Sequence, residues 1–426
     1  MKTGLSLRQS MHFTWLNLRR HTRRTVITAG AVAVGLMLYI IIDSMLLGLE
    51  QESNRNIIWY ETGAAQVVNE DYLAERDLRP LTSTLDDPEE IIARLEEVGL
   101  SSTIRTVFSG EMIVFYDPYP EDGSVNITAY GIDPLRDENV FRLKQNIEEG
   151  DYIQAGTSQA LIGAWLAEDL EAEVGYPFTI VTRTREGFYQ TIDLEIAGIL
   201  RTPNPIINRN CIFLPLDVAD DYLQMGAHAT EVAVASPPGS SLDELTGVMR
   251  TALAGISCIE TVSWKQLASD AVAIAEAKQS GTGLILLLVF VIAAVGISNT
   301  ILMSILERTR ELGMMRAIGM RDGEVMRILL LEAAGIGLMG GLIGIVLGAA
   351  GTLFMVNIGI DYSFLLRDVN IGYRFAGQLY GAWNPAAFVQ ALAAGIIISV
   401  MTALIPVRRA LKMPVIDALR NGKGVV

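Results

Sequence analysis

Residues 283–306 read Gly-Leu-Ile-Leu-Leu-Leu-Val-Phe-Val-Ile-Ala-Ala-Val-Gly-Ile-Ser-Asn-Thr-Ile-Leu-Met-Ser-Ile-Leu, and residues 307–316 continue Glu-Arg-Thr-Arg-Glu-Leu-Gly-Met-Met-Arg. The charge-free run that contains the first stretch extends from 279 to 306. A helix needs about 20 apolar residues to cross the hydrocarbon core of a bilayer, so this run is long enough to span a membrane. The sudden change to closely spaced charges predicts that the chain leaves the membrane at Glu307.

Three further charge-free runs are long enough to span a membrane: 25–42, 333–360 and 375–407, the last with its helix expected to start at Asn384-Pro385. The first run is longer than the apolar core of a signal peptide, which has about 7–15 residues, and no small-residue cleavage site follows it. We therefore expect four retained transmembrane helices. Glycines recur at every fourth position of the third run, which predicts close packing against the second and fourth helices of the same chain.

The distribution of charge predicts the orientation. Short cytoplasmic loops of membrane proteins carry an excess of Lys and Arg. Three segments are rich in these residues: Arg19, Arg20, Arg23 and Arg24; Arg308, Arg310, Arg316, Arg321 and Arg327; and Arg408, Arg409, Lys412, Arg420 and Lys423. All three lie on one side of the membrane if both termini are cytoplasmic, which places residues 49–280 outside.

The composition separates this chain from ordinary soluble enzymes. Of its 426 residues 19% are charged, against about 25% in a typical soluble domain. The outer segment 49–280 holds 15 basic and 39 acidic residues, whereas residues 1–24 hold six basic residues and no acidic one. Such asymmetry is typical of parts that face different compartments, and the acidic segment would repel polyanions, which argues against nucleic-acid binding.

The outer segment mixes two kinds of pattern. Alternating or β-branched stretches predict strands at 65–69, 103–108, 111–116, 125–130, 178–182, 191–200, 211–214 and 231–235. Helical patterns occur at 88–98, 164–173, 216–225 and 242–254. These patterns predict an α+β domain inserted between the first two spans, with an inserted subdomain at about 131–215. Its ends are expected to enter the membrane as continuous helices, 45–60 and 267–306.

The fold class expected is thus an α-helical membrane protein with four transmembrane helices and an inserted α+β extracytoplasmic domain. The expected division is 1–24 basic cytoplasmic segment, 25–48 first span, 49–280 outer domain, 281–306 second span, 307–327 cytoplasmic loop, 328–357 third span, 358–385 external loop, 386–406 fourth span and 407–426 cytoplasmic tail.

The sequence contains no recognisable catalytic motif. It has no Gly-x-Ser-x-Gly elbow, no His-Glu-x-x-His pair and no Gly-x-x-x-x-Gly-Lys-[Ser/Thr] phosphate loop, and His228 is the only outer histidine. Cys211 and Cys258 allow either a disulfide or two free, buried thiols. We therefore expect no catalytic residue, metal site or bound cofactor on this chain, and any ATP has to bind to another subunit.

By composition alone, the segment after the second span is an ordinary basic inner loop. Its order, Glu307-Arg-Thr-Arg-Glu-Leu-Gly-x-x-Arg-Ala-Ile-Gly319, resembles the coupling-helix signature of the FtsX/MacB-type ABC transporter permeases. The tail, Ile405-Pro-Val-Arg-Arg-Ala-Leu-Lys-Met-Pro-Val-Ile-Asp-Ala-Leu-Arg420, is similar to the C-terminus of that family. The plan of one span, a large outer domain and three further spans agrees with it, so the resemblance covers nearly the whole chain and implies a MacB/FtsX-like fold.

The resemblance implies a permease subunit that works with a dimer of separate ATPase subunits, which would carry the ATP and Mg, and with a second permease subunit, identical or paralogous. It assigns the ATPase-coupling role to Glu307, Arg308, Glu311, Gly313, Arg316 and Gly319. The helix is expected to break at Gly313 and to end at Gly319. Arginine side chains offer fork-shaped donors for carboxylates on such a partner.

Three stretches, Gly131-Ile-Asp-Pro134, Ala160-Leu-Ile-Gly-x-x-Leu-Ala167 and Leu194-Glu-Ile-Ala-Gly-Ile-Leu200, resemble the lipoprotein-releasing (LolC/LolE-type) permeases. That branch takes lipidated proteins from the outer leaflet of the bacterial inner membrane, in a cavity between the first and second spans. The corresponding residues here are Leu36, Met37, Tyr39, Ile40, Asp43, Met45, Leu284, Leu287, Leu288 and Val291. For any one of them, contact with membrane lipids or core packing is the simpler interpretation.

A periplasmic carrier is a further partner in that branch, but its docking stays open here. The Arg183–Gln190 turn is shorter than the proline-containing hook that one member uses for this purpose. Three other functions also remain: a MacB-type efflux permease, an FtsX-like signalling scaffold that moves no substrate, and, with least support, a membrane enzyme.

The orientation can be tested by labelling. In a variant without Cys211 and Cys258, single cysteines near Glu121 and Gly239 are expected to react with a membrane-impermeant thiol reagent in right-side-out vesicles, because both positions lie in the outer domain. A cysteine near Arg316 serves as the control and is expected to stay unlabelled. Labelling near Arg316 with protection at both outer positions would reverse the orientation.

Overall fold

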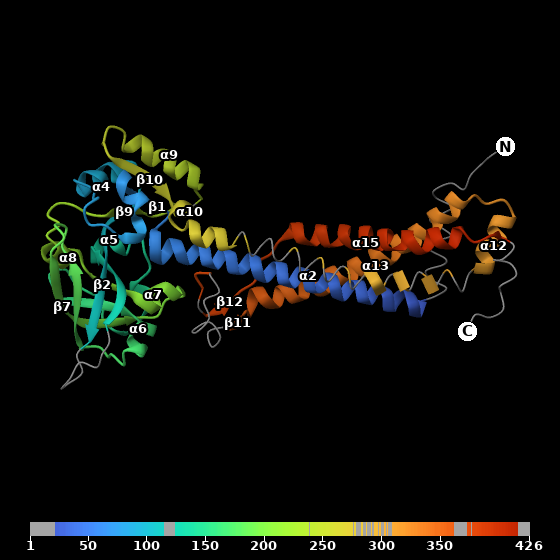
Figure 1. Ribbon diagram of the computed structural model, residues 1–426, viewed down its shortest axis with the longest axis horizontal. Coiled ribbons are helices and arrows are strands. Elements are labelled where there is room, and N and C mark those ends of the chain that lie inside the picture. The colour runs from blue at the N-terminus through green and yellow to red at the C-terminus, as the bar shows by residue number, and fades with distance from the viewer. Residues whose placement is uncertain are drawn as a thin grey trace. The chain divides into compact units, whose positions relative to one another are not determined.

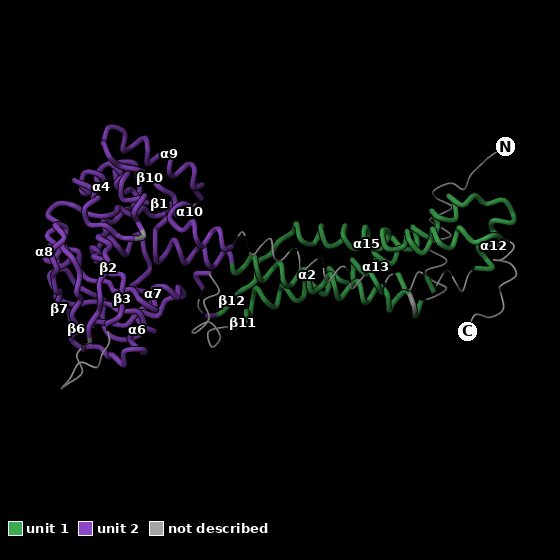
Figure 2. The backbone as a smooth tube through the Cα atoms, viewed as in Figure 1, with its two compact units in different colours: residues 1–49, 276–361, 378–426 green, residues 50–275, 362–377 purple. Residues whose placement is uncertain are grey.

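The computed structural model describes residues 22–114, 124–237, 239–275, 309–361, 373–375 and 377–415, together with scattered positions between 277 and 305. The chain divides into two compact units (Figure 2). Unit 1 comprises residues 1–49, 276–361 and 378–426, and unit 2 comprises residues 50–275 and 362–377. Most of the second predicted span, 281–306, lies outside the described residues.

Unit 1 is built from long helices. They are α2 (Thr22–Ile57, of which 22–49 belong to this unit), α12 (Thr309–Ala317), α13 (Asp322–Asn357) and α15 (Pro385–Leu411), with a small antiparallel pair formed by β11 (Ile360–Asp361) and β12 (Gln378–Leu379). Within the described residues, three helices are long and apolar enough to cross a membrane: Thr25–Thr62, Asp322–Asn357 and Pro385–Leu411. They contain most of the runs 25–42, 333–360 and 375–407. As predicted, Asn384 is the N-cap of α15 and Pro385 its first residue.

The glycines of α13 allow two helices to approach its backbone. A β-carbon at Gly344 would lie 2.9 Å from the Ala33 carbonyl oxygen of α2, and one at Gly337 would lie 2.5 Å from the Gly395 carbonyl oxygen of α15. Both distances are shorter than a real β-carbon tolerates, so only glycine permits this packing. Packing against the fourth helix of the same chain, α15, is confirmed, and α2 is a further neighbour that we did not expect. Most of the second helix, the other expected neighbour, lies outside the described residues. The spacing of glycines predicts which face of a helix is in close contact, but it does not predict which neighbouring helix packs there.

Unit 2 alternates short helices and strands (Figure 1). Its helices and helical turns are η1 (Ile58–Thr62), α3 (Glu70–Ala74), η2 (Arg76–Leu78), α4 (Pro88–Glu97), α5 (Pro134–Asp137), η3 (Lys144–Asn146), α6 (Ala164–Asp169), α7 (Pro205–Asn210), α8 (Leu216–Leu223), α9 (Leu242–Ala252) and α10 (Trp264–Leu267). Its strands are β1 (Ala65–Asn69), β2 (Ser102–Val114), β3 (Ser124–Ile132), β4 (Ile147–Gly150), β5 (Gln159–Gly163), β6 (Pro177–Arg183), β7 (Tyr189–Leu200), β8 (Cys211–Pro215), β9 (Glu231–Val234) and β10 (Ile259–Ser263).

The described strands of unit 2 form one mixed sheet in the order β10-β1-β9-β2-β3-β8-β5-β7-β4, with β6 paired to both β2 and β7. Among these described strands, only the pairs β3–β8 and β5–β7 are parallel. The segment 131–215, for which we expected an inserted subdomain, contributes β4 to β8 to this same sheet. The sheet therefore continues through that segment and into the flanking strands.

The predicted strands correspond to β1, β2, β3, β6, β7, β8 and β9, but β2 is one strand where we expected two, 103–108 and 111–116. The expected break is wrong because Gly110 marks a close approach: a β-carbon there would lie 2.6 Å from Cγ2 of Ile180 on β6. β4, β5 and β10 were not predicted. For β4 the reason is that its four residues, Ile-Glu-Glu-Gly, carry no apolar alternation. Helix α4 starts as expected, since the Asp87 carboxylate caps the Glu90 amide.

The two cysteines are both free in the structure, so no disulfide forms. Cys211 is buried in the sheet, as expected for a free thiol, and burial raises its pKa to about 12, which suppresses thiolate formation. Cys258 is exposed, which corrects the expectation that both thiols are buried.

An ion pair lies in the core of unit 2. Nε and Nη2 of Arg105 on β2 donate to the two carboxylate oxygens of Asp137 at the end of α5, at 2.9 and 3.1 Å. Both side chains are almost completely inaccessible, at 0% and 1% exposure, and the guanidinium lies 3.2 Å from the ring centroid of Phe141. The mutual attraction and the two hydrogen bonds of such a pair offset part of the cost of removing both charges from water.

Removing one partner of this pair is expected to cost stability. Replacing Arg105 with Met leaves the Asp137 charge buried and unpaired, which typically destabilises by about 3–5 kcal/mol. Arg136→Met is a matched control, because Arg136 pairs with Glu89 at the surface, where such pairs contribute at most about 1 kcal/mol. Urea unfolding of the full chain in detergent, followed by tryptophan fluorescence, measures both. Equal losses in the two variants would contradict the assignment.

Candidate functional site

Helix α12 contains most of the described part of the predicted coupling segment. It runs without interruption from Thr309 to Ala317, so the expected break at Gly313 is wrong. Gly313 is buried in the middle of the helix. The chain turns at Gly319, whose φ of +106° is a conformation that glycine adopts most readily. Glu307 and Arg308 lie outside the described residues.

The side chains of α12 separate into two faces. Leu312 and Gly313 are buried, whereas Arg310, Glu311 and Met314 are exposed, together with Ile318 just beyond the helix end. Met314 is 49% and Ile318 82% exposed. The sequence analysis singled out Glu311 but not these two apolar residues. Their spacing of four, on the same face as Glu311, is the signal that identifies them.

Arg316 has its partners within the chain. Its Nη1 donates to the Met413 carbonyl oxygen at 2.8 Å, and its Nε lies 2.8 Å from Oδ1 of Asp322. Its side chain is 16% exposed. Arg316 therefore fastens α12 to the end of α15 and to the first turn of α13, and its guanidinium is already engaged where the resemblance implied contact with an ATPase.

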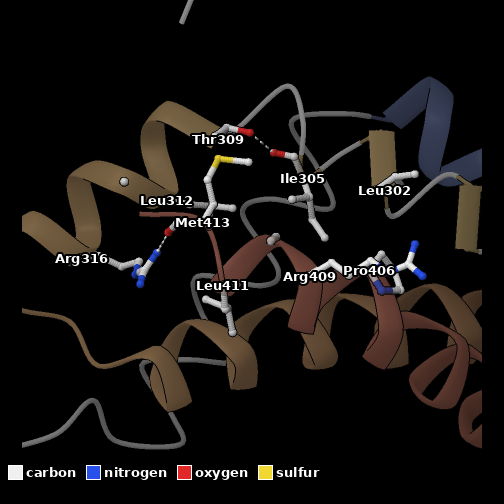
Figure 3. Close-up of a pocket in the computed structure, with 11 residues that line it drawn as sticks. Leu302, Ile305, Thr309, Leu312, Arg316, Pro406, Arg409, Leu411 and Met413 are labelled. Atoms are coloured by element: carbon white, nitrogen blue, oxygen red, sulfur yellow. Dashed lines mark hydrogen bonds between the residues drawn. The ribbon is translucent and has the colours of Figure 1, made fainter. Parts of the chain in front are cut away.

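An apolar cavity of about 150 Å³ lies beside α12 (Figure 3). Most of the side chains around it are apolar, and Arg316 and Arg409 contribute to its wall; the other lining residues are Leu302, Ile305, Thr309, Leu312, Gly313, Pro406, Ala410, Leu411 and Met413. One of the dashed lines in Figure 3 marks the hydrogen bond from Arg316 to the Met413 carbonyl oxygen. This space leaves α12 incompletely packed on its inner face.

The candidate cavity residues of the first span fall into two groups. Leu36 and Ile40 are 2% and 1% exposed and pack against Gly344 and Gly348 of α13. The other four are half-buried: Met37, Tyr39, Asp43 and Met45. Two of these hold polar contacts to the region of α15, since Tyr39 donates to Oε1 of Gln390 at 3.0 Å and Nδ2 of Asn384 donates to Asp43 at 2.8 Å.

Of the candidates on the second span, Leu287 and Val291 are described, and they are 59% and 52% exposed. Leu284 and Leu288 lie outside the described residues. On α2, the exposed apolar positions nearest the candidates are Val34 and Leu38, at 49% and 42%. Sequence alone did not separate these from Leu36 and Ile40, because the entire run is apolar.

No chemical centre appears in the described part of the chain. Among those residues, no group of three or more His, Cys, Asp or Glu side chains has a metal-binding arrangement. His228 lies 3.3 Å from Oδ1 of Asp86, but that carboxylate group belongs to a side chain 93% exposed to solvent. This is an ordinary surface pair.

Two family models match this chain. The FtsX-like permease C-terminal model matches residues 283–415, and the MacB-like periplasmic core domain model matches residues 25–252, more than half of the chain. The first match includes α12, α13 and α15, and the second covers most of unit 2.

Three relatives show the range of similarity. An uncharacterized ABC transporter permease of Methanocaldococcus jannaschii is 26% identical over 289 residues, 65% of this chain and 66% of the relative. The macrolide export ATP-binding/permease protein MacB of Burkholderia thailandensis is 33% identical over 136 residues, 32% of this chain and 18% of its own length. The ABC transporter permease YtrF of Bacillus subtilis is 35% identical over 136 residues, 31% of this chain and 30% of its own.

The matches cover less than two thirds of the length of each of these relatives. The two family models nevertheless cover the membrane helices and the outer domain in the order that the structure shows. This chain therefore belongs to the FtsX-like, MacB-type family of ABC transporter permeases.

Proposed function

We propose that this chain is a permease subunit of the bacterial inner membrane that works with a dimer of separate ATPase subunits and a second permease, and extracts lipidated proteins from the outer leaflet. Both termini are cytoplasmic and unit 2 is periplasmic in this proposal. The observation that carries the ATPase partnership is the two-sided character of α12. One face is fastened by Arg316 to Asp322 and Met413, and the other presents Glu311, Met314 and Ile318.

A helix of this kind suits the transmission of force. A partner that binds the exposed face would move α12, and the two Arg316 contacts would carry that movement to α13 and the end of α15. Apolar side chains ringed by charges are typical of the centre of a protein interface. ATP and Mg would be held by the partner subunits, and this chain would supply none of their ligands.

The proposed substrate class follows from the exposed apolar positions. Acyl chains bind through apolar area, at about 0.8 kcal/mol for each buried CH₂ group, and need no specific polar partner. Val34 and Leu38 of the first span and Leu287 and Val291 of the second offer such area. Leu36 and Ile40 support this surface from behind, because they pack on the glycines of α13.

A second candidate is export of a small amphiphile in the manner of MacB. The names of several relatives support it, since they are described as macrolide export proteins. An FtsX-like scaffold that transmits a signal without moving a substrate is the third. The three differ in what the exposed apolar surface contacts, and so one crosslinking experiment separates them.

The ATPase contact is tested on the exposed face of α12. Ile318→Asp combined with Glu311→Lys is expected to reduce co-purification of the partner ATPase at least about tenfold, because it places a charge in an apolar contact and reverses another. Arg327→Glu is the control, since it reverses an exposed charge in the second turn of α13, outside α12. Undiminished ATPase binding by the double variant would contradict the role of α12.

The substrate is tested with photo-crosslinkers. At Leu38 and Leu287 we expect capture of a triacylated lipoprotein, and loss of the crosslink when ATP and the partner ATPase are added. A crosslinker at Ile40 is the control and is expected to capture only residues of this chain, because that side chain is buried. Capture of a macrolide in place of the lipoprotein would favour efflux, and ATP-insensitive crosslinks to phospholipid alone would favour the scaffold.

A further inference from the structure

Arg374 lies at the centre of a polar cluster in unit 2. Its Nε is 3.0 Å from Oε1 of Glu61 on η1, and its Nη2 is 3.3 Å from Oδ2 of Asp270, which follows α10. The side chains of Arg374 and Glu61 are only 12% and 14% exposed, whereas Asp270 is 67% exposed. The contact with Glu61 is therefore better shielded from water and salt than the contact with Asp270.

The backbone of Arg374 is held as well. Its amide donates to Oγ of Ser53 at 2.9 Å, and its carbonyl accepts from Nδ2 of Asn56 at 2.9 Å. Ser53 and Asn56 are both buried and belong to the last turns of α2. A residue bound through its side chain, its amide and its carbonyl has little freedom to move independently of its partners.

A loop of the sheet domain completes the cluster. Nδ2 of Asn204 donates to Oε1 of Glu61 at 2.6 Å, and Asn56 also reaches the Pro203 carbonyl at 3.4 Å. Asn204 is fully buried and is also the N-cap of α7. The Glu61 carboxylate thus contacts both Arg374 and Asn204. We call the six residues Ser53, Asn56, Glu61, Asn204, Asp270 and Arg374 the Arg374 clamp.

The members of the clamp come from four separate stretches of the chain. Ser53, Asn56 and Glu61 follow the first predicted span, Asp270 precedes the second, and Arg374 belongs to the segment between the third and fourth. Asn204 belongs to the loop between β7 and α7. One arginine therefore joins the extramembrane ends of the segments that lead to all four predicted spans, and it joins them to the sheet domain.

We propose that Arg374 is a positioning residue for transport: it ties the external segment between the last two spans to both ends of the outer domain, so that these segments move as one body. This rests on the proposed function, because it assigns the clamp to the step that converts ATP hydrolysis into work on the substrate. A guanidinium fits this place because its planar fork reaches two carboxylates at once, which the single ammonium of lysine does less well.

The experiment measures coupling and hydrolysis separately. The full chain is reconstituted with its partner ATPase and second permease in proteoliposomes that contain a fluorescent triacylated lipopeptide. Arg374→Ala is expected to keep ATPase assembly and the rate of ATP hydrolysis within about twofold of wild type. The amount of lipopeptide released for each ATP hydrolysed is expected to fall about tenfold, which is within the range typical of coupling between distant sites. Arg374→Lys is expected to recover part of the loss.

The matched control is Arg201→Ala. Arg201 also contacts two carboxylates, Glu148 and Glu168 at 2.6 Å each, but it is 44% exposed and lies outside the clamp. Its replacement is expected to leave the ratio of release to hydrolysis unchanged. A ratio for Arg374→Ala equal to that of this control would overturn the proposal.

A covalent replacement tests whether the tie itself matters. In a Cys258→Ser background, Ser53→Cys with Arg374→Cys places one thiol on each side of the contact between the Arg374 amide and Ser53 Oγ, and mild oxidation is expected to join them in a disulfide. The oxidised protein should regain most of the wild-type ratio and the reduced protein should not. Low coupling in the crosslinked protein would overturn the proposal.

The crosslink can be scored on the purified permease alone, whatever the substrate is. A failure of the proposed function appears elsewhere, as a wild-type chain that recruits no ATPase or releases no lipopeptide. The two failures are therefore distinguishable.

Discussion

Close contact between helix backbones is the interaction on which unit 1 depends. In a lipid environment burial of apolar side chains drives helices together only weakly, because lipid tails are as apolar as the side chains, so association relies on packing. Gly337 and Gly344 provide that packing by letting α15 and α2 approach the backbone of α13 to distances that no larger residue allows. The same contacts turn Leu36 and Ile40 inward, and so determine which neighbouring positions of α2 remain exposed.

Two arginine–carboxylate pairs shielded from solvent link separate segments of unit 2. Arg105 and Asp137 pair in the core, and Arg374 and Glu61 pair where α2, the loop before α7 and the segment between the last two spans converge. In both places an arginine contacts more than one partner group, which suits a guanidinium better than an ammonium. The Arg105–Asp137 pair joins β2 of the sheet to α5, whereas the Arg374–Glu61 pair joins segments that are far apart along the chain.

Arg316 shows how a structure changes the meaning of a motif. The resemblance places it among residues that contact an ATPase, yet its guanidinium binds Met413 and Asp322 of its own chain. Its contribution to the proposed coupling would then be indirect, by holding α12 rigid against α13 and α15 while Glu311, Met314 and Ile318 meet the partner. A basic residue that contributes to the orientation predicted by the positive-inside rule can thus also fasten a helix.

The sequence by itself determined the features that follow from local pattern. Charge-free runs identified α2, α13 and α15, alternation identified β1 and β7, and the order of residues from Glu307 to Gly319 identified the family, which the matching family models confirm. Each of these depends on neighbours along the chain, which a sequence displays directly. The tertiary structure alone decided that Gly110 lies inside a strand, that Gly344 faces α2, and that Arg374 meets Glu61 and Asp270. These contacts join residues as much as about three hundred positions apart. Which residues meet is decided by packing in three dimensions, and a single sequence carries no periodic signal for it.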